Sequence, residues 1–141
     1  MSFLEKAFSS GIAPFVTYDV SRVPKTFNIQ DTVASVKSAP SGSVLVIDAG
    51  TQALSGIVTE NDLAKLVGGN INSAEDLATK EVVAIRENAQ LWQMLKIING
   101  ENILNRPLEY LPVVDAANKP VGVINRKGLQ DRLAKFEQGM T

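Results

Sequence analysis

The chain has 141 residues, of which 45% are hydrophobic and 21% are charged, and its net charge is −1. This is typical of one globular domain, or of two half-domains too small to hold separate cores. The near-neutral charge gives no general attraction for nucleic acid, and no apolar run approaches the roughly 20 residues that span a bilayer. With no cysteine and no secretory signal at its start, the chain is expected to be cytoplasmic.

Residues 1–22 predict an N-terminal docking segment. Phe3, Leu4, Ala7 and Phe8 recur at helical spacing before a glycine and a proline interrupt the pattern. A solvent-exposed stripe with two phenylalanines would favour aggregation. We therefore expect this short helix to dock on the rest of the protein.

Residues 23–69 predict a first structural repeat of strand, helix, strand, strand and helix. These elements are expected at residues 27–29, 33–36, 44–47, 54–58 and 60–67. The last helix is expected to end at Gly68 and Gly69, because glycine is favoured just past a helix C-terminus.

Residues 70–78 are polar and turn-prone, so we expect a linker there, followed by a second repeat over residues 79–136 and a tail over residues 137–141. The second repeat is expected to open with a strand at residues 81–85 and to continue with a helix, whose apolar face consists of Leu91, Met94, Leu95 and Ile98.

The two repeats share a hairpin that leads into a helix. Val44–Asp48 and Gly56–Thr59 in the first copy correspond to Leu111–Asp115 and Gly122–Asn125 in the second. The two aspartates are expected to cap the backbone where the hairpins turn. A final helix is expected at residues 129–136.

The copies differ in length ahead of this hairpin. Ile29 and Asp48 are 19 positions apart, whereas Ile85 and Asp115 are 30 positions apart. We therefore expect a shortened helix in the first copy and an extra loop at residues 102–109 in the second, since surface loops tolerate insertions.

The order of elements, with Leu111–Asp115 ahead of Pro120–Ile124, resembles the CBS domain, a module named after cystathionine β-synthase. Two copies resemble a CBS pair, or Bateman module, over about residues 23–136. The resemblance implies an α/β fold in which the two repeats pack with pseudo-two-fold symmetry. It also implies a cleft that binds adenosine compounds such as AMP, ADP, ATP or S-adenosylmethionine.

The residues Gly56–Asp62 match the motif that joins the last strand to the last helix in such domains. The resemblance implies that Asp62 accepts hydrogen bonds from ribose hydroxyls and that Thr59 contacts the sugar or phosphate. The same two residues also fit a capping box, in which the threonine and the acid three residues later satisfy backbone N–H groups without any ligand. Both interpretations are open at this level.

The base of an adenosine ligand would need an apolar slot. The resemblance points to the opening and central strands of the same repeat, where Thr26, Phe27 and Val46 are the candidates. A phenylalanine in such a strand is more often a core residue, so Phe27 has this alternative.

The second copy departs from the motif, since Asn125 and Gly128 stand where threonine and aspartate are usual. Glycine has no side chain to hold a ribose, so at most one well-formed site is expected. Arg126 and Lys127 could pair with the phosphates of a nucleotide held by the first copy. Alternatively, they are solvated charges in the first turn of a helix.

An enzymatic role is not expected, because the chain has no histidine or cysteine and no glycine-rich phosphate loop. Two functions are compatible with the sequence. One is a regulatory module that senses an adenosine compound at a single site and signals through homodimer geometry to a partner or fused domain. The other is a structural dimerisation module without a ligand. Trp92 is expected to pack or to form a subunit contact.

Overall fold

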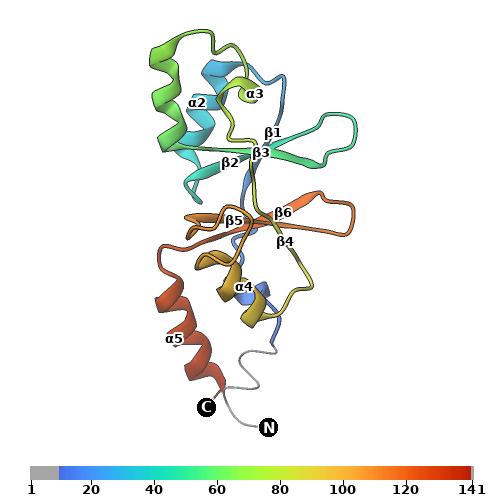
Figure 1. Ribbon diagram of the computed structural model, residues 1–141, viewed down its shortest axis with the longest axis vertical. Coiled ribbons are helices and arrows are strands. Elements are labelled where there is room, and N and C mark those ends of the chain that lie inside the picture. Colours follow the sequence, from blue (N-terminus) through green and yellow to red (C-terminus); the bar gives the residue numbers. More distant parts are fainter. Residues whose placement is uncertain (1–9, 141) are drawn as a thin grey trace.

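The computed structural model describes residues 10–140 and divides into two similar halves stacked along the long axis (Figure 1). Each half has a three-stranded sheet with helices on one side. The two sheets lie toward the middle of the molecule, and the helices lie toward its two ends. This is the tandem α/β architecture that the repeated hairpin predicts.

The first half contains a mixed sheet of order β1-β2-β3, in which β1 runs parallel to β2 and β3 runs antiparallel to it. Its elements are β1 (Ser21–Pro24), α2 (Ile29–Ser38), β2 (Ser43–Ile47), β3 (Leu54–Thr59) and the 3-10 helix η2 (Glu60–Gly68). Gly69 follows η2 with a φ of +78°, so the predicted glycine stop is confirmed.

The second half repeats this order as β4-β5-β6 with the same strand directions. Its elements are β4 (Ile85–Arg86), α4 (Leu91–Ile98), β5 (Tyr110–Val114), β6 (Pro120–Asn125) and α5 (Leu129–Met140). The predicted opening strand at residues 81–85 is therefore reduced to a short β4. Two further short helices, η1 (Ala13–Phe15) and α3 (Ala74–Leu77), precede the two repeats.

The predicted strand at residues 27–29 is wrong, because the first strand is β1 and the chain turns at Phe27, whose N–H donates to the Pro24 oxygen at 3.0 Å. Asn28 then caps α2, since its side-chain oxygen accepts from the Asp31 N–H at 2.8 Å. The helix begins at Ile29 and has 10 residues against 8 in α4, so the first copy does not have a shortened helix. Part of the difference in length lies in the following loop, residues 39–42 against residues 99–109. The rest arises because Ile29 begins α2 whereas Ile85 begins β4, so the two starting positions are not equivalent.

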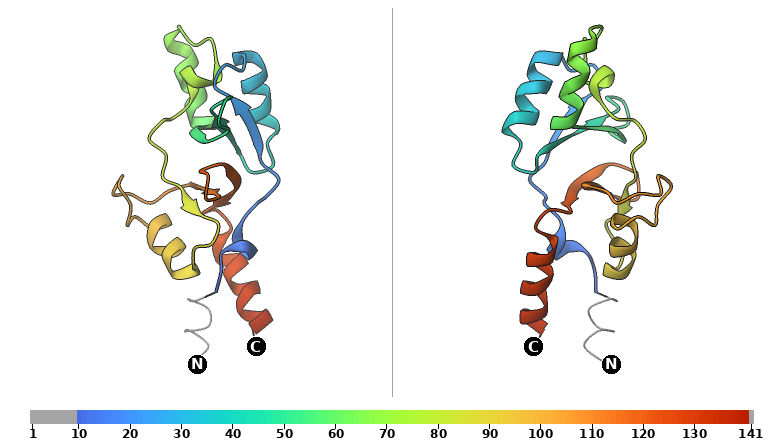
Figure 2. Two further views of the ribbon diagram at one scale, coloured as in Figure 1. Left: turned by 90° about the vertical axis from the view of Figure 1, so that its right-hand side faces the viewer. Right: turned by 60° about the vertical axis from the view of Figure 1, so that its left-hand side comes forward.

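The segments ahead of β1 and β4 are exchanged between the halves. Thr17 forms an antiparallel bridge with Val123 of β6, and Thr79 forms the same bridge with Ile57 of β3. The two connections run between the halves on opposite sides of the molecule (Figure 2). The segment that leads into each repeat therefore packs against the last strand of the other half.

The core follows this exchange. Ile12, Phe15 and Val16 pack in the hydrophobic cluster of the second half, although they precede the first repeat. Ala74 and Leu77 are fully buried in the cluster of the first half, within the segment predicted as a polar linker. The predicted docking helix over Phe3–Phe8 lies outside the described residues, so the docking segment stays a prediction.

Two glycines allow the exchanged segments to approach the sheets. A Cβ at Gly56 would lie 2.9 Å from the Thr79 oxygen, and a Cβ at Gly122 would lie 2.7 Å from the Thr17 oxygen and 2.5 Å from Val16 Cγ1. All three distances are below ordinary van der Waals contact. The glycine shared by the two repeats is therefore required by packing between backbones.

No helix within residues 10–140 is long and apolar enough to cross a membrane.

Replacing Gly122 by alanine is expected to destabilise the protein by about 1–3 kcal/mol, because the added methyl group meets backbone and Val16 at once. Gly68→Ala is the control, since nothing lies within 4 Å of its Cβ position. Urea unfolding measures both variants. Equal midpoints for the two would contradict the packing role of Gly122.

Candidate ligand site between the halves

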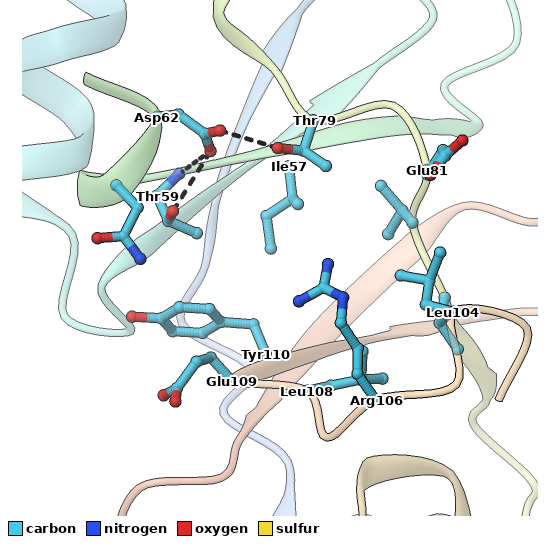
Figure 3. A pocket seen from close by; sticks show the side chains of 13 residues that line it. Ile57, Thr59, Asp62, Thr79, Glu81, Leu104, Arg106, Leu108, Glu109 and Tyr110 are labelled. Carbon is cyan, nitrogen blue, oxygen red and sulfur yellow. Dashed lines mark hydrogen bonds between the residues drawn. The ribbon is translucent and has the colours of Figure 1, made fainter. Parts of the chain in front are cut away.

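A cavity of about 250 Å³ lies between the two halves, beside the motif that the sequence singles out (Figure 3). The first half contributes the end of β3 and the start of η2. The second half contributes the loop before β5, and the exchanged segment ahead of β4 closes one side. The lining residues are Ile57, Thr59, Asn61, Asp62, Thr79, Glu81, Val82, Val83, Leu104, Arg106, Leu108, Glu109 and Tyr110.

Asp62 is the buried charged group of this site, with 7% of its surface exposed. One carboxylate oxygen, Oδ2, accepts from the Thr59 N–H at 2.9 Å and from the Thr59 hydroxyl at 3.3 Å. This is the bond from acid to N-cap backbone that a capping box requires. The capping interpretation is therefore confirmed for Asp62, and it does not depend on a ligand.

The other carboxylate oxygen of Asp62 reaches away from the helix. Oδ1 accepts from the Thr79 hydroxyl at 2.8 Å and lies 2.9 Å from Lys65 Nζ. Lys65 also donates to the Leu77 oxygen at 3.0 Å. Asp62 thus ties the start of η2 to the exchanged segment, and a ligand hydroxyl would have to share or replace these partners.

The apolar wall of the cavity belongs to a hydrophobic cluster between the halves. Leu45 and Ile57 from the first half pack with Val123 from the second, and Val82 and Tyr110 pack against them. Three of these residues, Ile57, Val82 and Tyr110, also line the cavity. A planar apolar group entering the cavity would meet this wall.

Tyr110 supplies a neutral phenol to the site. Burial raises its pKa above the ordinary value of 10.0, and the nearby carboxylates Glu109 and Glu60 raise it further. Its hydroxyl lies against Gly42 of the first half, where a Cβ would be 2.8 Å away. At neutral pH the phenol is therefore protonated and able to donate a hydrogen bond.

Thr59 and Asp62 are the predicted site residues that the structure brings to the cavity. Thr26, Phe27 and Val46 do not line it. Val46 is 1% exposed and packs with Phe27 in the helix-facing core of the first half. Successive residues of a strand point to opposite faces, so Leu45 rather than Val46 faces the other half.

Arg126 and Lys127 are also absent from the cavity lining. Arg126 Nη2 lies 3.5 Å from Glu109 Oε1, so it approaches the site through a residue that does line it. Lys127 is exposed, and its N–H donates to the Asn125 side chain at 3.1 Å. The alternative of solvated charges describes Lys127 better than Arg126.

The equivalent position in the second half lacks a carboxylate. Gly128 replaces Asp62, and the Thr17 hydroxyl, which corresponds to that of Thr79, accepts instead from Arg132 Nη2 at 3.2 Å. Arg132 Nη1 also donates to the Phe15 oxygen at 2.8 Å. Asn125 donates to the Ser41 oxygen at 3.3 Å across the two halves. In the second half an arginine therefore contacts the threonine whose counterpart in the first half is bound by Asp62.

Sequence reasoning missed Thr79, Arg106 and Tyr110. The extra loop at residues 102–109 was visible as a length difference, but its direction toward the first half was not. Thr79 lies just past the predicted linker. Each of these residues reaches the site through contacts between the halves, which local patterns do not record.

Other predicted roles can be placed. Asp48 Oδ1 accepts from the Gly50 and Thr51 N–H groups at 2.9 and 3.0 Å, and Asp115 caps its own hairpin turn in the same way. These backbone hydrogen bonds lower the pKa of Asp48 below its ordinary value of 3.8.

Trp92 is 41% exposed on α4, and Lys96 Nζ lies 5.6 Å from the centre of its ring.

Comparison with known families identifies the second half directly, because residues 74–135 match the family model of the CBS domain. Solved CBS pairs share the fold of most of the chain. The structure of CBSX2 in complex with AMP covers 91% of this chain and 98% of its own, with a TM-score of 0.72 and 20% identity. The structure of the CBS domain pair of MJ0100 in complex with 5′-methylthioadenosine and S-adenosyl-L-methionine covers 86% of this chain and 98% of its own. Its TM-score is 0.70 and its sequence identity is 17%.

Curated relatives are larger proteins. Homoserine O-acetyltransferase of Methanosphaera stadtmanae is 26% identical over 123 residues, which is 87% of this chain and 23% of the relative. Homoserine O-acetyltransferase of Methanocorpusculum labreanum is 32% identical over 85 residues, 60% of this chain and 16% of the relative. The chain thus spans less than a quarter of the length of these relatives.

The raised pKa of Tyr110 predicts that stability is lost at high pH. A phenol that binds its proton more tightly in the folded state contributes fully below pH 10.0, and this contribution falls as the pH rises through the folded pKa. Absorbance titration of wild type minus Tyr110→Phe should give a phenolate midpoint above 10.0. A midpoint at or below that value would contradict the burial argument.

Asp62→Ala is expected to destabilise the protein by about 1–3 kcal/mol, because it removes a helix cap and leaves the Thr79 hydroxyl without its partner. The free energy of urea unfolding measures this loss. A change within about 0.5 kcal/mol of wild type would show that the cap is dispensable.

Proposed function

Residues 74–135 belong to the CBS domain family and the chain has the fold of a CBS domain pair, and on this basis we propose that it is a regulatory module that binds an adenosine compound between its halves. The site is single and is centred on Asp62 of the first repeat. The ligand is AMP, ADP, ATP or S-adenosylmethionine. The module itself is not catalytic, and a cytoplasmic location is part of the proposal.

The observation that carries the proposal is that Asp62 and an apolar wall line the same cavity. A carboxylate offers two acceptor oxygens to the vicinal hydroxyls of a ribose. Tyr110 offers an aromatic ring and Val82 offers aliphatic surface against which a purine could lie. The base is therefore proposed to lie against these residues rather than against Thr26, Phe27 or Val46.

Related folds support the ligand class. CBSX2 is solved with AMP, and the CBS pair of MJ0100 with S-adenosyl-L-methionine and 5′-methylthioadenosine. All three ligands carry an adenosine group. Their shared chemistry matches a site that presents one buried carboxylate beside an apolar wall.

A single site is proposed because the two halves differ at the decisive position. Asp62 faces the cavity in the first half, whereas Gly128 has no side chain and Arg132 holds Thr17 in the second. A guanidinium does not accept hydrogen bonds from ribose hydroxyls.

Signalling is proposed to act through the partners of Asp62. Ribose hydroxyls that bind Oδ1 would compete with Thr79 and Lys65, which connect η2 to the exchanged segment and to Leu77. Ligand would then shift the packing of one half on the other, and in a homodimer this shift would reach a regulated partner or fused domain. The larger relatives are compatible with a fused domain.

A structural module without ligand is the alternative, and one observation favours it. Both oxygens of Asp62 are already occupied by groups of the protein itself. The carboxylate is therefore explained without a ligand, and the pair could serve only to dimerise or to hold other domains.

Calorimetric titration with AMP, ADP, ATP and S-adenosylmethionine separates the two functions. We expect wild type to bind one of them at about one ligand per chain and Asp62→Ala to lose the binding by at least tenfold, since hydrogen bonds to a charged group contribute about 1.5–3 kcal/mol.

Asp31→Ala is the matched control. Asp31 occupies the same third position of its helix as Asp62 and accepts from Asn28, but it does not line the cavity. The Asp31→Ala variant should weaken the start of α2 and leave the affinity for the ligand unchanged. Absence of binding by a folded wild-type protein at millimolar ligand would establish the structural alternative.

A further inference from the structure

We propose that Arg106 binds the anionic 5′ group of the ligand and selects an adenosine monophosphate over a triphosphate. The inference rests on the proposed adenosine site and adds the residue that recognises the ligand's charge. Arg106 comes from the loop of residues 99–109, and its guanidinium points into the cavity toward Ile57 (Figure 3).

The loop holds Arg106 in place through Asn102. The Asn102 amide donates to the Ile97 oxygen at 2.7 Å and to the Arg106 oxygen at 2.9 Å, while its side-chain oxygen accepts from the Leu104 N–H at 2.9 Å. Leu108 is buried, and its N–H donates to the Ile98 oxygen at 2.9 Å. The backbone that carries the guanidinium is thus anchored to α4 on both sides of Arg106.

Arg106 is the cation of the cavity that has no ionic partner. Among the described residues, Asp62 pairs with Lys65 and Glu109 pairs with Arg126, whereas no ion pair involves Arg106. A guanidinium that no carboxylate occupies remains available for a phosphate, which it can bind with two parallel hydrogen bonds.

The surrounding carboxylates limit how much negative charge the ligand can bring. Asp62, Glu81 and Glu109 all line the cavity, and Glu81 has no ion pair within the described part of the chain. One free cation among these acids suits one phosphate. The additional charges of a triphosphate would face Glu81 without compensation, and like charges brought together disfavour binding.

The loop also distinguishes the halves. The corresponding connection in the first half is residues 39–42, too short to carry a side chain in the manner of Arg106. The half that lacks the ribose carboxylate therefore supplies the charge contact, and the half that has the carboxylate lacks the loop. Together they form one complete site.

Titration with adenosine, AMP and ATP tests the inference on wild type, Arg106→Ala and the control Arg86→Ala. Arg86 lies exposed on β4 outside the cavity, so the control removes the same charge. Arg106→Ala should lower the affinity for AMP by roughly 10- to 100-fold and change the affinity for adenosine by less than about twofold. Arg86→Ala should bind both as wild type does.

Two further variants refine the assignment. Arg106→Lys keeps the charge but loses the fork of donors, so an intermediate loss of AMP affinity is expected. Glu81→Gln should raise the affinity for ATP more than that for AMP, because it removes the uncompensated carboxylate. In wild type we expect AMP to bind about tenfold more tightly than ATP.

The outcomes separate this inference from the proposed function. If wild type binds adenosine but AMP no more tightly, or if Arg106→Ala weakens both equally, the role of Arg106 is wrong while the adenosine site stands. Tighter binding of ATP or S-adenosylmethionine than of AMP would overturn the selectivity. Binding of ATP or S-adenosylmethionine without any binding of adenosine or AMP would overturn the role of Arg106 alone. Failure of wild type to bind adenosine, AMP, ADP, ATP and S-adenosylmethionine would overturn both proposals.

Discussion

The close contact of Thr17 with Gly122 and of Thr79 with Gly56 is the constraint on which the rest of the structure depends. In each case a segment that belongs to one repeat forms a bridge with the last strand of the other. The backbone oxygen of each threonine lies where a Cβ would stand. Because the repeats exchange their leading segments, neither can complete its core without the other, and the two copies form one folding unit.

The same exchange explains how two similar halves produce one site. Both crossings deliver a threonine hydroxyl beside the start of the last helix. In the first half that hydroxyl meets Asp62, and in the second it meets Arg132. A carboxylate accepts hydrogen bonds and a guanidinium donates them. The first half therefore has a group that could bind ribose hydroxyls, whereas the second half has only a contact between its own residues.

Asp62 combines a structural and a proposed functional role. It caps η2 with one oxygen and holds the crossing segment with the other. A buried carboxylate with such partners stabilises the fold in any case, and this makes it well suited to a sensor, because any ligand that binds it must act on contacts between the halves. The asymmetric loop that carries Arg106 approaches the same cavity from the second half.

Local patterns in the sequence predicted the features that depend on neighbouring residues: the strands just ahead of Asp48 and Asp115, the helix beginning at Leu91 and the glycine stop after η2. For Asp62 the same patterns allowed a cap but did not decide between a cap and a ligand contact. Alternation, helical spacing and turn chemistry are local, so they can be read directly. Tertiary structure alone decided that Leu45 rather than Val46 faces the other half, and that residues 74–78 enter a core. It also decided that Thr79, Arg106 and Tyr110 meet Asp62. These outcomes depend on the crossing of distant segments, which no short pattern in the chain encodes.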